Sequence, residues 1–208
     1  EIFFNTYGVR ADVEFESYLT KYDHCLLSDA ARNDLASLRA RGAACVAAAT
    51  ARYSLPPVKA AEEHQLYSPE AELAMALIGF NDVPLIGYGS LNYLAEQFGH
   101  SGERLLKPVP VQALAAIGAA CGNSTWDALR WAYQLVAGRE HFTDLPRMRG
   151  DFHLPVVLPD TLEIHIFEDS PIGIQACIDG AEILNQMGHV TDLFAWGITN
   201  HPAKAEAL

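Results

Sequence analysis

Apolar residues follow two kinds of pattern along this chain, one typical of strands and the other of helices. Short apolar runs occur at residues 2–4, 45–50, 84–87, 162–167 and 193–199. The segments between them place apolar residues three or four positions apart, as on one face of a helix. Short apolar strands in alternation with amphipathic helices predict an α/β domain with a mainly parallel sheet.

The clearest helix signal covers residues 28–41. Ser28 is a typical N-cap, Gly42 follows the last turn, and one face is apolar through Leu27, Ala31, Leu35 and Leu38. We predict further helices at residues 57–64, 68–79, 90–98, 111–120 and 173–187, and one that begins at the Ser124 cap. Ser68 is expected to cap the second of these, with Pro69 at its first position. Gly180 favours a break in the helix at 173–187.

A length of 208 residues suits one domain, which we take to span residues 1–208. The segment 122–160 differs in character, because its helix is followed by an irregular basic run with Arg139, Arg147 and Arg149. We interpret it as an insertion before the strand at 162–167. The basic run is either a flap over a binding site or, as is more typical of an acidic protein, a solvated loop.

The charge balance narrows the range of partners. The chain has 14 Lys and Arg against 26 Asp and Glu, a net charge of −12, which argues against nucleic-acid binding. No apolar run is long enough to predict a membrane span. Four cysteines stand far apart with no CxxC pair, so we expect thiols of a reducing compartment, three of them buried, and a cytoplasmic location.

The first candidate site lies where the strand at 162–167 ends. Glu168 and Asp169 follow this strand, and Ser170 and Pro171 then open a helix. Carboxylates at the carboxyl end of a parallel strand point to where α/β sheets bind ligands, and two of them are typical of a Mg²⁺ site. The alternative is a solvated strand end at which Ser170 only caps the helix.

Other predicted strand ends add groups that suit a phosphate. Thr50 offers a hydroxyl donor, Lys107 an ammonium, and Asn5 and Tyr7 follow the first strand. Together with the two acids these groups fit a phosphate and its metal ion. Thr50 alone is equally a strand cap, and Lys107 alone a solvated loop lysine.

Three of these segments resemble motifs of the haloacid dehalogenase-like (HAD) superfamily, most closely its β-phosphoglucomutase-like branch. FEDSPIGIQA at Glu168 resembles the fourth motif, KPVP at Lys107 the third, and AAATAR at Thr50 the second. The resemblance implies a Rossmannoid three-layer sandwich, phosphatase chemistry and a magnesium cofactor. It also implies that no sizeable cap lies between the first and second motifs, since Gly8 and Ser28 are too close in sequence.

The first motif departs from the family pattern. NTYGV stands where the family has DxDG[TV], so Asn5 takes the position of the nucleophile and Tyr7 that of the general acid and base. An amide is a very poor nucleophile, and a phenol with a pKa of about 10 is a poor proton shuttle at neutral pH. The resemblance then leaves Glu168 and Asp169 as the metal ligands, with Asn5 as a weak third. Without metal, we expect Lys107 to pair with Asp169.

Three functions remain open on this basis. The first is a HAD-like hydrolase homologue, catalytically impaired, that retains a pocket for phosphate or Mg²⁺. The second is an active phosphatase on a small phosphorylated metabolite, with Asp12 or another acid in place of the missing aspartates. The third is a structural or homo-oligomerising protein that uses the inserted region as its contact surface, for which an exposed Trp131 or Tyr133 would be the sign.

Overall fold

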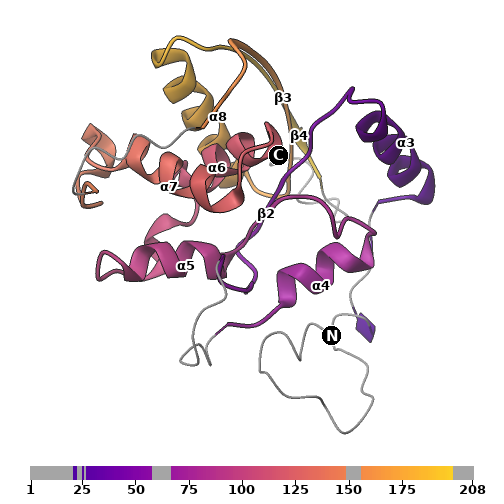
Figure 1. Cartoon of the computed structure of the whole chain (residues 1–208), viewed down its shortest axis with the longest axis horizontal. Coiled ribbons are helices and arrows are strands. Elements are labelled where there is room, and N and C mark those ends of the chain that lie inside the picture. The colour runs from indigo at the N-terminus through magenta and orange to yellow at the C-terminus, as the bar shows by residue number, and fades with distance from the viewer. Residues whose placement is uncertain (1–20, 23–24, 26, 58–66, 149–155, 199–208) are drawn as a thin grey trace, which may run out of the picture.

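The computed structural model describes residues 21–22, 25, 27–57, 67–148 and 156–198 (Figure 1). The strand predicted at 2–4 and nearly all of the helix predicted at 57–64 lie outside these residues. The described elements follow in the order α3 (Asp29–Ala40), β1 (Ala48–Ala49), α4 (Glu70–Leu77), β2 (Leu85–Ile86), α5 (Tyr88–Glu96), η1 (Gly102–Leu105), α6 (Val111–Ala120), α7 (Thr125–Val136), η2 (Glu140–Phe142), β3 (Thr161–Glu168), α8 (Pro171–Gln186) and β4 (Val190–Gly197).

The four described strands form two parallel pairs. Ala48 lies opposite Leu85 in the pair β1–β2, and Thr161 lies opposite Val190 in the longer pair β3–β4. Figure 1 shows α5, α6, α7 and α8 on one side of the strands and α3 and α4 on the other. The predicted α/β class with parallel strands is therefore confirmed.

Side-chain caps fix several helix ends. Ser28 accepts a hydrogen bond from the Ala31 amide at the start of α3, and Ser124 accepts one from the Asp127 amide at the start of α7, as predicted. The prediction for α4 was wrong in detail, because Pro69 is its N-cap and no side chain bonds to the first turn. α8 runs without a break through Gly180, whose small size lets Leu114 of α6 approach closely.

The core centres on α6 and α7. α7 buries six residues, namely Ala128, Leu129, Trp131, Ala132, Tyr133 and Val136. They pack against α6, where a Cβ on Gly118 would lie only 3.2 Å from the Ala128 Cβ. α7 falls within the segment 122–160, so this part of the segment belongs to the core, and its status as an insertion stays a prediction.

Among the described elements, a helix packs against one face of the pair β3–β4. Leu162 on the covered face is buried, and α8 packs near it. On the other face His165 stacks on Phe194 and Phe167 on Trp196, with 67% of Phe167 and 50% of Trp196 exposed. Among the described residues, no helix combines the length and apolarity needed to cross a lipid bilayer.

Tyr133 gives the core a pH dependence. It donates its hydroxyl to the Pro146 carbonyl at 2.8 Å, and burial, followed by the charge of Asp144, raises its pKa to about 12. The unfolded chain loses this proton near pH 10. The stabilising contribution is therefore complete below about pH 10 and is lost as the pH rises toward about 12.

Tyr133→Phe should lower the free energy of unfolding at pH 7 by about 1 kcal/mol, because the Pro146 carbonyl loses its donor. It should also weaken the fall in stability between about pH 10 and 12. Urea unfolding at several pH values measures both effects. Tyr53→Phe is the control, since Tyr53 is 52% exposed. Equal pH dependence in all three proteins would contradict the assignment to Tyr133.

Candidate functional site

An ion pair joins two of the predicted site residues. The Lys107 Nζ donates to the Glu168 Oε1 at 2.5 Å, and the two side chains are only 27% and 14% exposed. The predicted pairing of Lys107 with Asp169 was wrong. Glu168 is the last residue of β3 and lies on the same face as buried Leu162, toward α8, whereas Asp169 lies beyond the strand and is exposed.

The Glu168 carboxylate has a dedicated place at the start of α8. Its Oε1 also accepts from the Ser170 hydroxyl at 2.9 Å and from the Asp169 amide at 3.2 Å. Ser170 in turn caps α8 by accepting from the Gly173 amide, as predicted. A Cβ on Gly173 would lie 2.2 Å from the Glu168 Cδ, so only glycine leaves room for the carboxylate here.

Thr50 is connected to this region through Gln112. The Gln112 Nε2 donates to the Thr50 and Ile86 carbonyls, each at 2.8 Å, and so fastens the first turn of α6 to the ends of β1 and β2. Lys107 lies four residues before α6. The Thr50 hydroxyl accepts from the Arg52 amide, and both residues line a cavity of about 560 Å³ between β1 and α4. We call Thr50, Lys107, Glu168 and Ser170 the strand-end cluster.

Sequence reasoning missed Gln112, although one signal was available. It is the only polar residue in the helix VQALAAIGAA, and it is 2% exposed. A buried amide in an apolar helix requires partners for its polar atoms. Its Nε2 has two of them, whereas its Oε1 has none among the described residues.

A second missed residue, Ser54, fixes the start of α5. Its hydroxyl accepts from the Gly89 amide at 2.9 Å, and the side chain is 2% exposed. A Cβ on Gly89 would lie 2.0 Å from the Ser54 carbonyl oxygen. The N-cap residue of α5, Gly87, has no side chain to cap the helix. Ser54, which follows β1 and precedes Gly89 by 35 positions, supplies this hydrogen bond instead.

Magnesium does not fit the described residues well. The Glu168 Oε1 already accepts three hydrogen bonds, one of them from the Lys107 ammonium, and Asp169 is the only other acid of the predicted ligand set in the described part. A search of the described ranges finds no group of three His, Cys, Asp or Glu side chains arranged to hold a metal ion. Asn5, Tyr7 and Asp12 lie outside those ranges.

The thiols are less buried than predicted. All four cysteines are free, with Cys25 and Cys45 exposed and Cys121 and Cys177 partly buried. Burial, reinforced by the Glu168 charge, raises the pKa of Cys177 to about 11. This thiol therefore stays protonated at neutral pH and is a poor nucleophile beside the strand-end cluster.

The described part of the basic run begins at the other end of α8 from the strand-end cluster. Arg139 donates to the Gln186 Oε1 at 2.6 Å, at the last residue of α8, whereas Glu168 packs at the first turn of that helix. α8 has 16 residues and is about 24 Å long. The interpretation of Arg139 as part of a flap over the site was therefore wrong, and Arg149 lies outside the described residues.

Comparison with protein-family models, with curated proteins and with solved structures gives no match to this chain. The case for a site therefore rests on the residues themselves. The structure brings Lys107, Glu168 and Ser170 together and ties Thr50 to the same helix, α6, that Lys107 precedes.

Proposed function

We propose that the strand-end cluster binds the phosphate group of a small molecule and does not hydrolyse it, as a catalytically impaired homologue of the HAD-like hydrolases. The observation that carries the proposal is the Lys107 ammonium, which Glu168 holds at the end of β3. α6 begins four residues after Lys107 and has no side-chain cap, so no side chain satisfies its first amides. Glu168 offsets the charge of Lys107, so the remaining N–H donors of the ammonium and these amides, and not a net positive charge, favour a bound oxyanion.

The proposal includes the predicted HAD-like three-layer fold, in which the two described strand pairs belong to one mainly parallel sheet. Two-stranded parallel sheets bury too little to be stable alone, which favours one continuous sheet. α6 packs against β1 and β2 and also against α8, which packs against β3 and β4, so the helices that cover the two pairs contact each other. The resemblance to the HAD-like family implies that Asn5 and Tyr7, which lie outside the described residues, belong to the same edge as Thr50 and Glu168.

Chemistry sets the limit on turnover. An amide at position 5 cannot form an acyl-phosphate, and Tyr7 holds its proton too tightly to serve at neutral pH. In this proposal Asp169 and Asn5 would bind Mg²⁺ at most weakly, because Lys107 already neutralises the charge of Glu168. A reducing compartment such as the cytoplasm agrees with the four free cysteines.

The other two functions have less support. An active phosphatase needs an acid in place of Asn5, and no described residue of the strand-end cluster supplies one that is free of Lys107. Assembly through the inserted region was to be marked by an exposed Trp131 or Tyr133, and these are only 8% and 1% exposed. Neither of these two side chains therefore supports assembly through the inserted region.

Lys107→Met should weaken binding of phenyl phosphate at the strand-end cluster by at least about tenfold, because one charge-assisted hydrogen bond is lost. Isothermal titration of the whole chain measures this. Lys21→Met is the matched control, since Lys21 lies far from the cluster in sequence and carries the same charge.

Circular dichroism checks that each variant is folded. Thr50→Val serves as a second variant if Lys107→Met is too unstable, and it should weaken binding by a smaller factor. Unchanged affinity and stoichiometry in a folded Lys107→Met protein would rule out the strand-end cluster as the phosphate site.

A further inference from the structure

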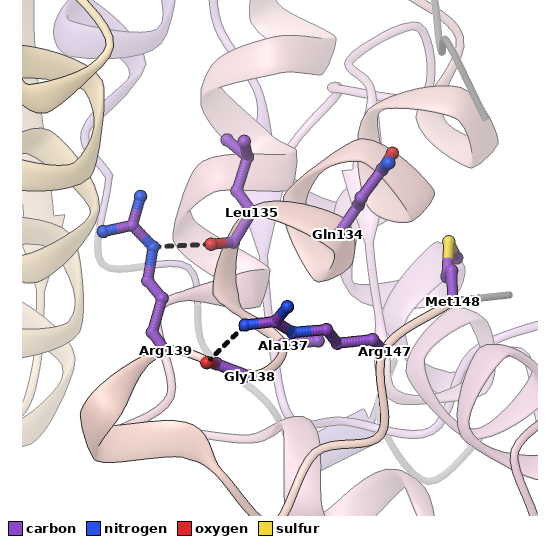
Figure 2. A pocket seen from close by; sticks show the side chains of 7 residues that line it. All are labelled: Gln134, Leu135, Ala137, Gly138, Arg139, Arg147 and Met148. Atoms are coloured by element: carbon purple, nitrogen blue, oxygen red, sulfur yellow. Dashed lines mark hydrogen bonds between the residues drawn. The ribbon is translucent and has the colours of Figure 1, made fainter. Parts of the chain in front are cut away.

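A cavity of about 500 Å³ opens where α7 ends (Figure 2). It is far from the strand-end cluster, since it adjoins the last residue of α8 through Arg139. Its lining consists of Gln134, Leu135, Ala137, Gly138, Arg139, Arg147 and Met148. Among the residues that the structure describes, the two guanidinium groups are the only charged members of this lining.

Neither arginine is paired with an acid among the described residues. Arg139 donates to the Leu135 carbonyl and to the Gln186 amide oxygen, both at 2.6 Å, and Arg147 donates to the Gly138 carbonyl at 3.2 Å. By contrast, Arg32, Arg39 and Lys107 each contact a carboxylate. In a chain with 26 acids and 14 bases, two arginines that line one cavity and contact no described carboxylate form a local excess of positive charge.

Gly138 lets the Arg147 side chain approach. Its φ of +77° favours glycine, and a Cβ there would lie 2.2 Å from the Arg147 Nε. The Arg147 guanidinium therefore lies directly against the backbone at the end of α7, and Figure 2 shows the Arg139 side chain extending from the adjacent residue. The two cations line one cavity because of this turn.

The charge balance of the cavity favours an anion. The end of α7 contributes a partial charge of about −0.5, whereas the two guanidinium groups contribute two full positive charges. Each guanidinium has five N–H donors, and the contacts above use only one or two of them. The remaining donors suit the oxygens of a phosphate or carboxylate, which arginine binds in bidentate geometry.

We propose that this cavity binds a small molecule through an oxyanion group, phosphate or carboxylate, held by Arg139 and Arg147. Leu135 and Met148 form the apolar part of the lining, against which the body of the ligand packs. The volume falls within the range of about 300 to 1,000 Å³ that is usual for small-molecule sites. The site is separate from the strand-end cluster and does not depend on the function proposed for it.

The test titrates the whole chain with phenyl phosphate and with benzoate, in the native protein and in Lys107→Met. In Lys107→Met the probes should still bind at one kind of site, the cavity lined by Arg139 and Arg147. Adding Arg139→Gln/Arg147→Gln to this variant should lower the remaining affinity by at least about tenfold. The probe with the higher affinity shows whether the cavity prefers a phosphate or a carboxylate. Arg41→Gln is the matched control, because the Arg41 Nε donates to the Ser37 carbonyl at the end of α3 in the same way, whereas its neighbour Arg39 is paired with Asp82.

Arg147→Gln alone decides the matter if the double variant does not fold, since Arg147 is exposed and makes a single bond to the protein. Arg147→Lys should bind with intermediate affinity, because it keeps the charge and loses the planar fork. The proposal is overturned if neither probe binds Lys107→Met at millimolar concentration, if the arginine variants bind as the native chain does, or if Arg41→Gln weakens binding equally.

Discussion

The Asn5→Asp/Tyr7→Asp double variant is expected to hydrolyse an aryl phosphate at least about 10³ times faster than the native chain, because loss of a nucleophile typically costs about 10⁴ to 10⁶ in rate. The first substitution supplies a carboxylate that can attack phosphorus. The second supplies an acid whose pKa suits proton transfer near neutral pH. Release of p-nitrophenol from its phosphate ester measures the rate.

The two substitutions can also be tested one at a time. Asn5→Asp alone should form an acyl-phosphate and turn over slowly, whereas Tyr7→Asp alone should stay inactive, since it lacks the nucleophile. Adding Lys107→Ala to the double variant should abolish the gain, because the ammonium is needed to hold the phosphate. The magnesium dependence of the gain would report whether the carboxylate introduced at position 5 completes a metal site.

Hydrolysis by the native chain itself would contradict the proposed function, provided that Lys107→Ala removes the activity. A double variant that binds phenyl phosphate and yet stays inactive would contradict the placement of residues 5 and 7 beside Lys107. The first outcome would contradict the proposed lack of turnover. The second would contradict the proposed fold.

Gly89→Ala should lower the free energy of unfolding by about 3 kcal/mol or more. The new Cβ would lie 2.0 Å from the Ser54 carbonyl oxygen and 2.9 Å from that of Leu55, and backbone atoms cannot rotate out of the way. Overpacking usually costs about 1 to 3 kcal/mol, and this site also loses the buried bond from the Gly89 amide to Ser54. Urea unfolding monitored by circular dichroism measures the loss.

Gly180→Ala is the matched control, because the same methyl group would meet the side chains of Leu114 and Ala113 at 3.4 to 3.9 Å and no backbone atom of another element within that distance. In the interior of α8 this change should stabilise the protein by up to about 1 kcal/mol. Equal effects of the two substitutions would show that the turn between β2 and α5 is not packed as described.

The elements with local signals were predictable from the sequence. The bounds of α6 agree with the prediction to the residue, and those of α3 and β3 to within one, because serine or proline caps and an unbroken apolar pattern mark their ends. β1 is shorter than its apolar run of residues 45–50, since strand length depends on which residues find a partner in β2. That partner is 37 residues away, and no local pattern specifies it.

The site was predictable as a set of residues and not as a set of contacts. Lys107 and Glu168 were both named from the sequence, yet the choice between Glu168 and Asp169 depends on which side chain of β3 faces α8. Gln112 and Ser54 were missed because their partners lie 62, 26 and 35 positions away. Buried polar contacts of this kind belong to the tertiary structure, and only a polar residue in an apolar run hints at them.

The stacked aromatic face of β3–β4 bears on how copies of the chain behave toward one another. At neutral pH a net charge of −12 makes copies repel, which opposes contact between two exposed Phe167–Trp196 faces. Near the pI of about 5.0 this repulsion vanishes and the apolar attraction between faces is unopposed. The colloidal stability of the protein is thus set by the distance of the solution pH from the pI, more than by its folding stability.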